Sequence, residues 1–243
     1  MGWSVLLLTY LFAQISYTGH VKNASVVSVF LQLIYIAKFF WWESGYAYSM
    51  DIQHDRAGYY ICWGCLLWVP LFYSVHTAWL VESPGDLGLA TSLLLLFIGV
   101  LSIKVNYDAD HQRQLVRKKG PLCKIWGETP KVIVATVTIR HETADDNIAI
   151  RKKKTILLYS GYWGIARHFH YVPEIIGSFC WCIPAAAGGR PIDWMFGLAY
   201  PIYLTILLVH RSWRDEEKCQ KKYGKYWDQY KQLVKYRILP GVY

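Results

Sequence analysis

The chain has 243 residues, of which 54% are hydrophobic and 16% aromatic, and its formal net charge is +9. A basic chain raises the question of nucleic-acid binding. Here most lysines and arginines lie in two blocks, 104–154 and 211–237, which alternate with long apolar runs. This alternation is typical of positive-inside topology in a multi-pass membrane protein. The composition therefore favours a membrane protein, and we expect no nucleic-acid partner.

Six apolar segments predict an all-α polytopic membrane fold with about six transmembrane helices: 4–17, 24–42, 59–81, 87–105, 172–187 and 192–209. Most approach or exceed the ~18 residues that a helix needs to cross a bilayer, whereas the first and fifth are short. Their backbone is expected to be helical because lipid offers peptide groups no hydrogen-bond partner. We interpret 1–243 as a single membrane domain with a cytosolic loop at 106–155 and a cytosolic tail at 210–243.

The distribution of charge predicts the orientation. If the basic tail is cytosolic, the basic segment 106–171 lies two spans back on the same side, and so does the polar loop 43–57. The acidic loop 82–86 then falls on the opposite side. Polar groups at one membrane face mark a site where they converge and a solvated loop where they do not. For 43–57 the sequence leaves both interpretations open.

The segment between the fourth and fifth apolar runs has a pattern of its own. Residues 107–117 continue the preceding span as a polar helix, on which Arg113 and Arg117 share a face at four-residue spacing. Residues 131–140 alternate in the manner of a strand, and 145–147 have the composition of a turn. A small hairpin is therefore expected.

Several familiar catalytic devices are absent from the sequence. There is no GxGxxG, no P-loop and no HExxH. Cys62 and Cys65 form a CxxC without a second pair, and the histidines form no HxxxH cluster of the kind that membrane di-iron enzymes use. We therefore expect no metal site, and we assign hydrogen-bonding roles to His168 and His170, which lie beside Arg167 and Tyr171.

Cationic and aromatic side chains remain, above all in the stretch 207–230. On a helix, Arg211, Asp215, Cys219 and Lys222 would share one face. Cations with a carboxylate, beside an aromatic face, suit a phosphorylated cofactor that carries rings, because arginine binds phosphate bidentately. The alternative is a solvated basic helix that faces lipid headgroups. The mixture of Arg, Asp and Tyr fits that alternative less well than a run of lysines would.

The tail from His210 to Tyr230 resembles the C-terminal signature of the membrane sterol reductases, H-R-x-x-R-D-x-x-x-C-x-x-K-Y-G-x-x-W-x-x-Y, at every fixed position. Further stretches at 39–43, 51–55, 164–174 and 236–243 support this likeness, and the nearest branch of the family is the plant-type delta-7 reductases. The resemblance covers essentially the whole chain. Members of the family carry about as much chain again before residue 1, so we expect a fragment or a short gene product.

The resemblance implies an NADPH-dependent reduction of the C7–C8 double bond of a sterol, 7-dehydrocholesterol or a related delta-5,7 sterol, at the endoplasmic reticulum membrane. The sterol would enter from the bilayer, with membrane lipids and other sterol-pathway enzymes as further partners. Arg113 stands where the family usually has lysine. The implied NADPH site consists of Arg113, Arg117, Leu158, Trp163, His170, Tyr171, Asp215, Cys219, Gln220, Lys221, Lys222, Tyr223 and Tyr230.

An isolated alkene is not electrophilic, so hydride attack requires a general acid that protonates it in a dry pocket. Our candidates are Asp215 and Tyr46, with Asp51, His54 and Asp55 as a possible relay. Two alternatives remain open. One is an isoprenylcysteine-type membrane methyltransferase, although the stretch 167–171 lacks the proline of that family's R-H-P-x-Y turn. The other is a non-catalytic sterol-binding membrane protein.

Overall fold

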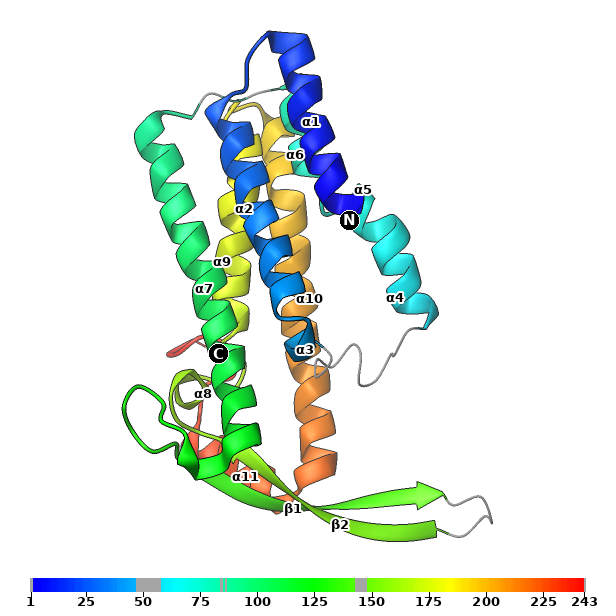
Figure 1. The fold of residues 1–243 in the computed structure, drawn as a ribbon, viewed down its shortest axis with the longest axis vertical. Helices are drawn as coiled ribbons and strands as arrows, with labels where there is room; N and C mark the ends of the chain where they lie inside the picture. The colour runs from blue at the N-terminus through cyan, green and yellow to red at the C-terminus, as the bar shows by residue number, and fades with distance from the viewer. Residues whose placement is uncertain (1, 47–57, 84, 86, 143–147, 243) are drawn as a thin grey trace. The chain divides into compact units, whose positions relative to one another are not determined.

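The computed structural model describes residues 2–46, 58–83, 85, 87–142 and 148–242, with the side chains of 46, 60, 61, 139–142 and 148–151 left aside. The chain divides into two compact units (Figure 1). We call Met1–Tyr107 with Pro173–Ile206 the membrane unit, and Asp108–Val172 with Leu207–Tyr243 the polar unit. Two long helices, α7 (Leu89–Lys119) and α10 (Pro191–Tyr223), contribute residues to both.

The described part of the membrane unit is helical. Besides its share of α7 and α10, it contains α1 (Gly2–Thr18), α2 (Asn23–Trp41), α3 (Glu43–Tyr46), α4 (Tyr59–Trp63), α5 (Val69–Leu71), α6 (Val75–Glu82) and most of α9 (Tyr171–Cys182). Four described stretches are long and apolar enough to cross a membrane: Asn23–Trp41, Gly64–Glu82, Leu89–Leu122 and Pro191–Tyr223.

This architecture confirms the prediction of a mostly helical, multi-pass membrane protein. Each of the six predicted apolar segments contains helix. The two that are short in the sequence form helices of fewer than ~18 residues, α1 with 17 and α9 with 12. After α9 the chain continues as a 3-10 turn, Ile183–Ala186.

The third apolar segment is not a regular helix. A π-helical turn, Gly64–Trp68, follows α4, and the helical conformation lapses between α5 and α6. Pro70 lies in this stretch and has no N–H with which to continue the ladder of helical hydrogen bonds. A proline and a π-turn are common causes of such a break.

Neutral hydrogen bonds join helices inside the membrane unit. Gln32 of α2 is fully buried, and its Nε2 donates to Oγ1 of Thr77 on α6 at 2.7 Å and to Oγ of Ser28 at 3.1 Å. Its Oε1 accepts from Nε1 of Trp3 on α1 at 3.2 Å. A buried amide is stable in an apolar bundle only when both its donors and its acceptor are satisfied, and this network does so across three helices.

The polar unit is built around a hairpin of two antiparallel strands, β1 (Val132–Glu142) and β2 (Ile148–Leu158), with Val132 opposite Leu158. The strand predicted at 131–140 is confirmed, whereas the turn predicted at 145–147 lies outside the described residues. Along β1, Ile133, Ala135 and Val137 are buried and the intervening side chains are exposed. One face of the hairpin therefore contributes to a core.

The last helix, α11 (Lys225–Leu233), covers that buried face. Trp227 and Tyr230 of α11, together with Val234 just after it, are buried at helical spacing. They form one hydrophobic cluster with Tyr223 at the end of α10 and with the buried residues of the hairpin, Ile133, Ala135, Val137 and Leu157. This packing attaches the C-terminal tail to the loop between the fourth and fifth apolar segments.

Candidate functional site

Trp163, on the short helix α8 (Tyr162–Ile165), is the centre of the candidate site in the polar unit. The turn before it needs glycine, because Gly161 has φ = 62° and an added Cβ would lie 2.3 Å from Oε1 of Gln112. The Trp163 indole donates to the carbonyl of Ala109 at 2.7 Å. Its own carbonyl accepts from the hydroxyl of Tyr230 at 3.2 Å. Burial raises the pKa of Tyr230, which therefore stays protonated as a donor.

A cation lies over the Trp163 ring. The guanidinium carbon of Arg113 is 4.2 Å from the ring centroid, which is a cation–π geometry. Arg113 also donates to Asp110 at 2.9 Å, so its orientation is set by two partners. Arg117 is exposed one helical turn further along α7 and is close enough to Cys219 for electrostatic interaction. The two arginines thus present positive charge beside an aromatic platform.

A row of rings continues from Trp163. The Trp163 and His170 ring centroids are 5.0 Å apart, and those of His170 and Tyr171 are 4.2 Å apart. Tyr171 in turn stacks on His168, with centroids 5.4 Å apart and an interplanar angle of 9°. At these distances the rings contact one another as aromatic pairs do, and together they form a continuous aromatic row.

His168 is a buried, neutral member of this row. Its side chain is 3% exposed. Burial lowers its pKa well below the ordinary value, and the neighbouring charges of His170, Arg113, Arg167 and Arg237 lower it further. Its Nδ1 lies 3.9 Å from the Asp215 carboxylate, and because the ring is neutral this contact is not an ion pair. Its Nε2 has no hydrogen-bond partner among the described residues.

Asp215 and Cys219 continue the site along α10. They lie four residues apart, and the Cys219 Sγ is 3.9 Å from Oδ2 of Asp215. Asp215 is 34% exposed, so its carboxylate is accessible from one side. Lys222 is exposed three residues further along, with its Nζ 5.2 Å from the Tyr223 ring centroid.

A buried ion-pair network next to the site was not predicted from the sequence. Glu216 accepts from Arg167 at 2.6 Å through one carboxylate oxygen and lies 2.7 Å from Arg237 through the other. Arg167 also donates to the carbonyls of Val234 and Lys235, at 2.7 and 2.8 Å. Local sequence contains no signal for this network, because its three charged members come from segments far apart in the chain.

Two backbone hydrogen bonds join the same two segments, the turn at 167–168 and the tail at 236–237. The N–H groups of Arg167 and His168 donate to the carbonyls of Tyr236 and Arg237, at 3.0 and 2.7 Å. The segment 234–237 is therefore held against the turn that carries His168. The network fixes the position of His168 relative to Asp215, the residue that precedes Glu216.

Residues 1–243, the whole chain, match the family described as the Ergosterol biosynthesis ERG4/ERG24 family. The chain belongs to this sterol reductase family. The resemblance noted in the tail signature is thereby confirmed, and the methyltransferase and non-catalytic alternatives are not favoured.

Individual sterol reductases are similar over the full length of the chain. The chain is 46% identical over 243 residues to a protein named 7-dehydrocholesterol reductase from Arabidopsis thaliana, of which it covers 53%. It is 36% identical to the protein of the same name from Xenopus laevis, of which it covers 49%. A protein named Delta(14)-sterol reductase from Methylotuvimicrobium alcaliphilum is 31% identical over 241 residues, 51% of its length. The chain thus spans about half the length of these sterol reductases.

The structure brings most of the predicted site residues of this sterol reductase chain together in the polar unit. A continuous set of contacts links Arg113 to Cys219 through the rings of the row and Asp215. Leu158 is buried in one cluster with Trp163, and Tyr223 is buried beside Tyr230. The residues gathered in this way are Arg113, Arg117, Leu158, Trp163, His170, Tyr171, Asp215, Cys219, Lys222, Tyr223 and Tyr230.

Other predicted residues are placed differently. Gln220 bonds to Asp228 and Lys231 of α11, at 3.2 and 2.9 Å, and so takes part in the junction of the last two helices. Lys221 is exposed. The backbone of Tyr46 ends α3, but its side chain is not among those described. Asp51, His54 and Asp55, the predicted relay, lie outside the described residues.

Proposed function

We propose that the chain takes part in the NADPH-dependent reduction of the C7–C8 double bond of a sterol, 7-dehydrocholesterol or a related delta-5,7 sterol. One observation carries the proposal. In a chain that belongs to the sterol reductase family, the polar unit connects an arginine, a row of aromatic rings and a carboxylate through direct contacts, from Arg113 to Asp215. The 46% identity to a protein named 7-dehydrocholesterol reductase favours the delta-7 bond.

The donor set suits NADPH. Arg113 and Arg117 would bind its phosphates, because guanidinium groups pair with phosphate oxygens in a bidentate fork. The rings of Trp163, His170 and Tyr171 would receive the nicotinamide or the adenine. The buried Nε2 of His168 offers one further hydrogen bond. The remaining wall would consist of Leu158, Asp215, Cys219, Gln220, Lys221, Lys222, Tyr223 and Tyr230.

NADPH, when bound, supplies the hydride. The chain's own residues supply the proton, which an unactivated double bond needs before it accepts a hydride. Asp215 is the first candidate, because its carboxyl is accessible and lies beside the neutral His168. Because His168 is neutral, it would orient that carboxyl without holding it in its ionised form by an ion pair. A proton delivered to one carbon of the double bond builds positive charge on the other, where the hydride adds.

Tyr46 is the second candidate acid, with Asp51, His54 and Asp55 as its relay. These residues lie in the polar loop 43–57 of the sequence. A tyrosine can donate a proton within hydrogen-bond reach and recover it from such a relay. The two candidates lie in different parts of the chain: Asp215 belongs to the polar unit and Tyr46 to the membrane unit.

We further propose that the protein resides in the endoplasmic reticulum membrane and works there as a single membrane domain. The loop 106–155 and the tail 210–243 would be cytosolic, which the concentration of lysine and arginine in these segments supports. The sterol would enter from the bilayer, and membrane lipids and other sterol-pathway enzymes would be the further partners.

Sterol profiling tests the activity. The chain is expressed in cells deficient in delta-7 reductase, alone and joined to the upstream half of the Arabidopsis thaliana relative, and sterols are measured by mass spectrometry. We expect the C7–C8-reduced sterol to accumulate with the joined protein. Its absence from cells in which that protein is folded and membrane-inserted would contradict the proposed reaction.

Substitutions in the joined protein test the acid. Asp215→Asn and Tyr46→Phe each remove one candidate proton donor, and loss of a general acid costs about 10²–10⁴-fold in turnover. Glu217→Gln, at an exposed position two residues from Asp215, is the matched control and should keep its activity. If both substitutions leave turnover unchanged, neither residue is the proton donor.

A further inference from the structure

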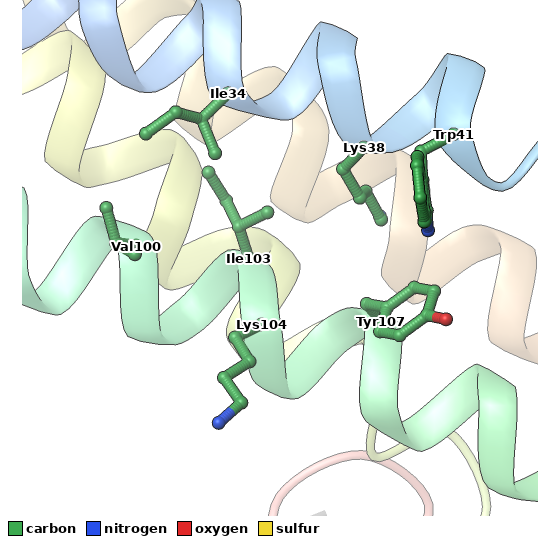
Figure 2. Close-up of a pocket in the computed structure, with 7 residues that line it drawn as sticks. All are labelled: Ile34, Lys38, Trp41, Val100, Ile103, Lys104 and Tyr107. Atoms are coloured by element: carbon green, nitrogen blue, oxygen red, sulfur yellow. The ribbon is translucent and has the colours of Figure 1, made fainter.

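A groove of about 250 Å³ lies between α2 and the first part of α7, entirely within the membrane unit. Figure 2 shows Ile34 and Ile103 facing one another across it, with Trp41 and Tyr107 at its other end. It shares no residue with the candidate site of the polar unit. The complete lining is Ile34, Lys38, Trp41, Val100, Ile103, Lys104 and Tyr107.

The groove begins beside a point where α2 and α7 are in close contact. At Gly99 of α7 an added Cβ would lie 2.6 Å from Cδ1 of Leu31, which is fully buried. Ile34, one turn after Leu31 on α2, lines the groove. Val100, the residue after Gly99 on α7, lines it as well. Val100 is 40% exposed, so the groove is open along this wall.

One end of the groove is positively charged. Lys38 is half-buried, and its Nζ donates to the amide oxygen of Asn106 and lies 5.1 Å from the ring centroid of Tyr35. Neither contact neutralises its charge. Lys104 is exposed and extends along the flank of α7 that faces away from α2 (Figure 2). The seven lining residues include these two lysines and no carboxylate.

Aromatic residues indicate the depth of this charged end in the membrane. Trp41, at the end of α2, is 86% exposed, and Tyr107 lies opposite it on α7. Exposed tryptophan and tyrosine at the ends of spanning helices are typical of the membrane–water interface. Beyond Tyr107 the sequence of α7 becomes polar. Lys38 and Trp41 therefore lie toward the level of lipid phosphates, and Ile34 and Val100 toward the level of acyl chains. Lys104, the neighbour of Ile103, can extend its side chain to the phosphate level, as lysines near the ends of spanning helices do.

We propose that this groove binds one phospholipid with an anionic headgroup. An acyl chain would lie along Ile34, Val100 and Ile103, and the headgroup would lie at Lys38, toward which the exposed Lys104 side chain would turn. Basic pockets between transmembrane helices bind anionic headgroups in this way. The Lys38 side chain is held by its contacts with Asn106 and Tyr35, whereas the exposed Lys104 side chain can change its rotamer. The pair can therefore adapt to the position of a phosphate.

The chemistry of the groove favours a phospholipid over a sterol. A sterol offers a single neutral hydroxyl, which leaves both lysines without an anionic partner. A groove of this size holds one chain of a lipid whose remainder stays in the bilayer.

Native mass spectrometry of the purified chain in detergent tests the proposal. The protein is mixed with phosphatidylserine and phosphatidylcholine of equal acyl composition, and the retained lipid is counted. We expect a preference for phosphatidylserine. Lys104→Gln should lower it about fivefold, and the double change Lys38→Gln with Lys104→Gln about 25-fold. Lys22→Gln, which changes the same charge just before the opposite end of α2, should preserve it.

A second variant separates the groove from general surface charge. Val100→Trp fills the groove and leaves both lysines in place, so it should also abolish retention of phosphatidylserine. Retention by Val100→Trp, equal retention of the two phospholipids, or displacement of phosphatidylserine by an equal amount of cholesterol would overturn the proposal. If the double variant does not fold, Lys104→Gln alone decides, because that side chain is exposed and has little part in packing.

Discussion

The buried Gln32 of the membrane unit bonds to neutral partners, whereas the buried Arg167 of the polar unit is held by an ion pair. Gln32 joins Ser28, Thr77 and Trp3 without any formal charge. In the polar unit, Glu216 bridges two arginines across segments that are distant in sequence. A charge in the centre of a bilayer is costly, while a neutral amide that is fully bonded is tolerated. In these two places the need of a buried polar group for a partner is therefore met by different chemistry.

An ion pair at the start of α10 refines this comparison. Asp193 is fully buried and accepts from Arg190 at 2.8 Å and from the Trp79 indole at 2.9 Å. It lies in the first turn of α10, where the helix dipole favours a negative charge, and Arg190 is largely exposed. This ion pair of the membrane unit thus lies at a helix end, where the dipole stabilises the carboxylate. The polar unit uses it in an interior that also supports the candidate cofactor site.

The largest effect is expected from breaking the ion-pair network. Glu216→Gln removes the charge that pairs with Arg167 and Arg237 and should lower the free energy of unfolding by about 3 kcal/mol, because the buried guanidinium of Arg167 loses its charged partner. Equilibrium unfolding in detergent measures it, and hydrogen exchange at 234–237 should rise. Glu217→Gln, at an exposed neighbouring position, is the control. Equal effects of the two changes would show that the network contributes no stability of its own.

A smaller effect is expected from the neutral network of the membrane unit. Gln32→Leu leaves Thr77, Ser28 and the Trp3 indole without their shared partner and should cost about 1 kcal/mol, in the range of interhelical hydrogen bonds in membranes. The same unfolding assay applies. Ser92→Ala is the control, because among the described residues that hydroxyl bonds to the carbonyl of Gly88 in its own helix and joins no second helix. A cost above that of Glu216→Gln would reverse the comparison between the two units.

The pH dependence of stability should depend on His168. Its pKa is lowered in the folded protein, so below the unfolded value of 6.5 the unfolded state binds more protons. The contribution of His168 to the free energy of unfolding is complete above that pH. It is lost on acidification, by up to about 1 kcal/mol between about pH 6.5 and about pH 5.5. The difference in unfolding free energy between the wild type and His168→Gln should therefore shrink as pH falls over this interval. The exposed substitution His111→Gln should keep the wild-type dependence.

The smallest effect is expected at the surface of the polar unit. Asp228 pairs with Lys231 at 3.0 Å on the exposed side of α11, and the hydrogen bonds from Lys231 and Gln220 lower its pKa. Solvent and salt screen such a pair, so Asp228→Asn should leave the unfolding midpoint unchanged within replicate scatter. A shift comparable to that of Glu216→Gln would mean that burial does not distinguish the two ion pairs.

Periodicity in the sequence determined much of the architecture. Runs of apolar residues predict the helices of the membrane unit, and alternation at 131–140 predicts β1. Spacing along 211–222 places Asp215 and Cys219 on one face of α10, and the same stretch contains the family signature. These predictions succeed because helix and strand periods are local properties of the chain.

Only the tertiary structure decided which distant residues meet. Glu216 pairs with Arg167, 49 residues before it, and Trp163 receives a hydrogen bond from Tyr230, 67 residues after it. The groove between α2 and α7, which begins beside the close approach of Gly99 to Leu31, likewise has no counterpart in local spacing. Such contacts depend on how whole elements pack, and packing is determined by the shapes of many side chains at once rather than by the pattern of any one segment.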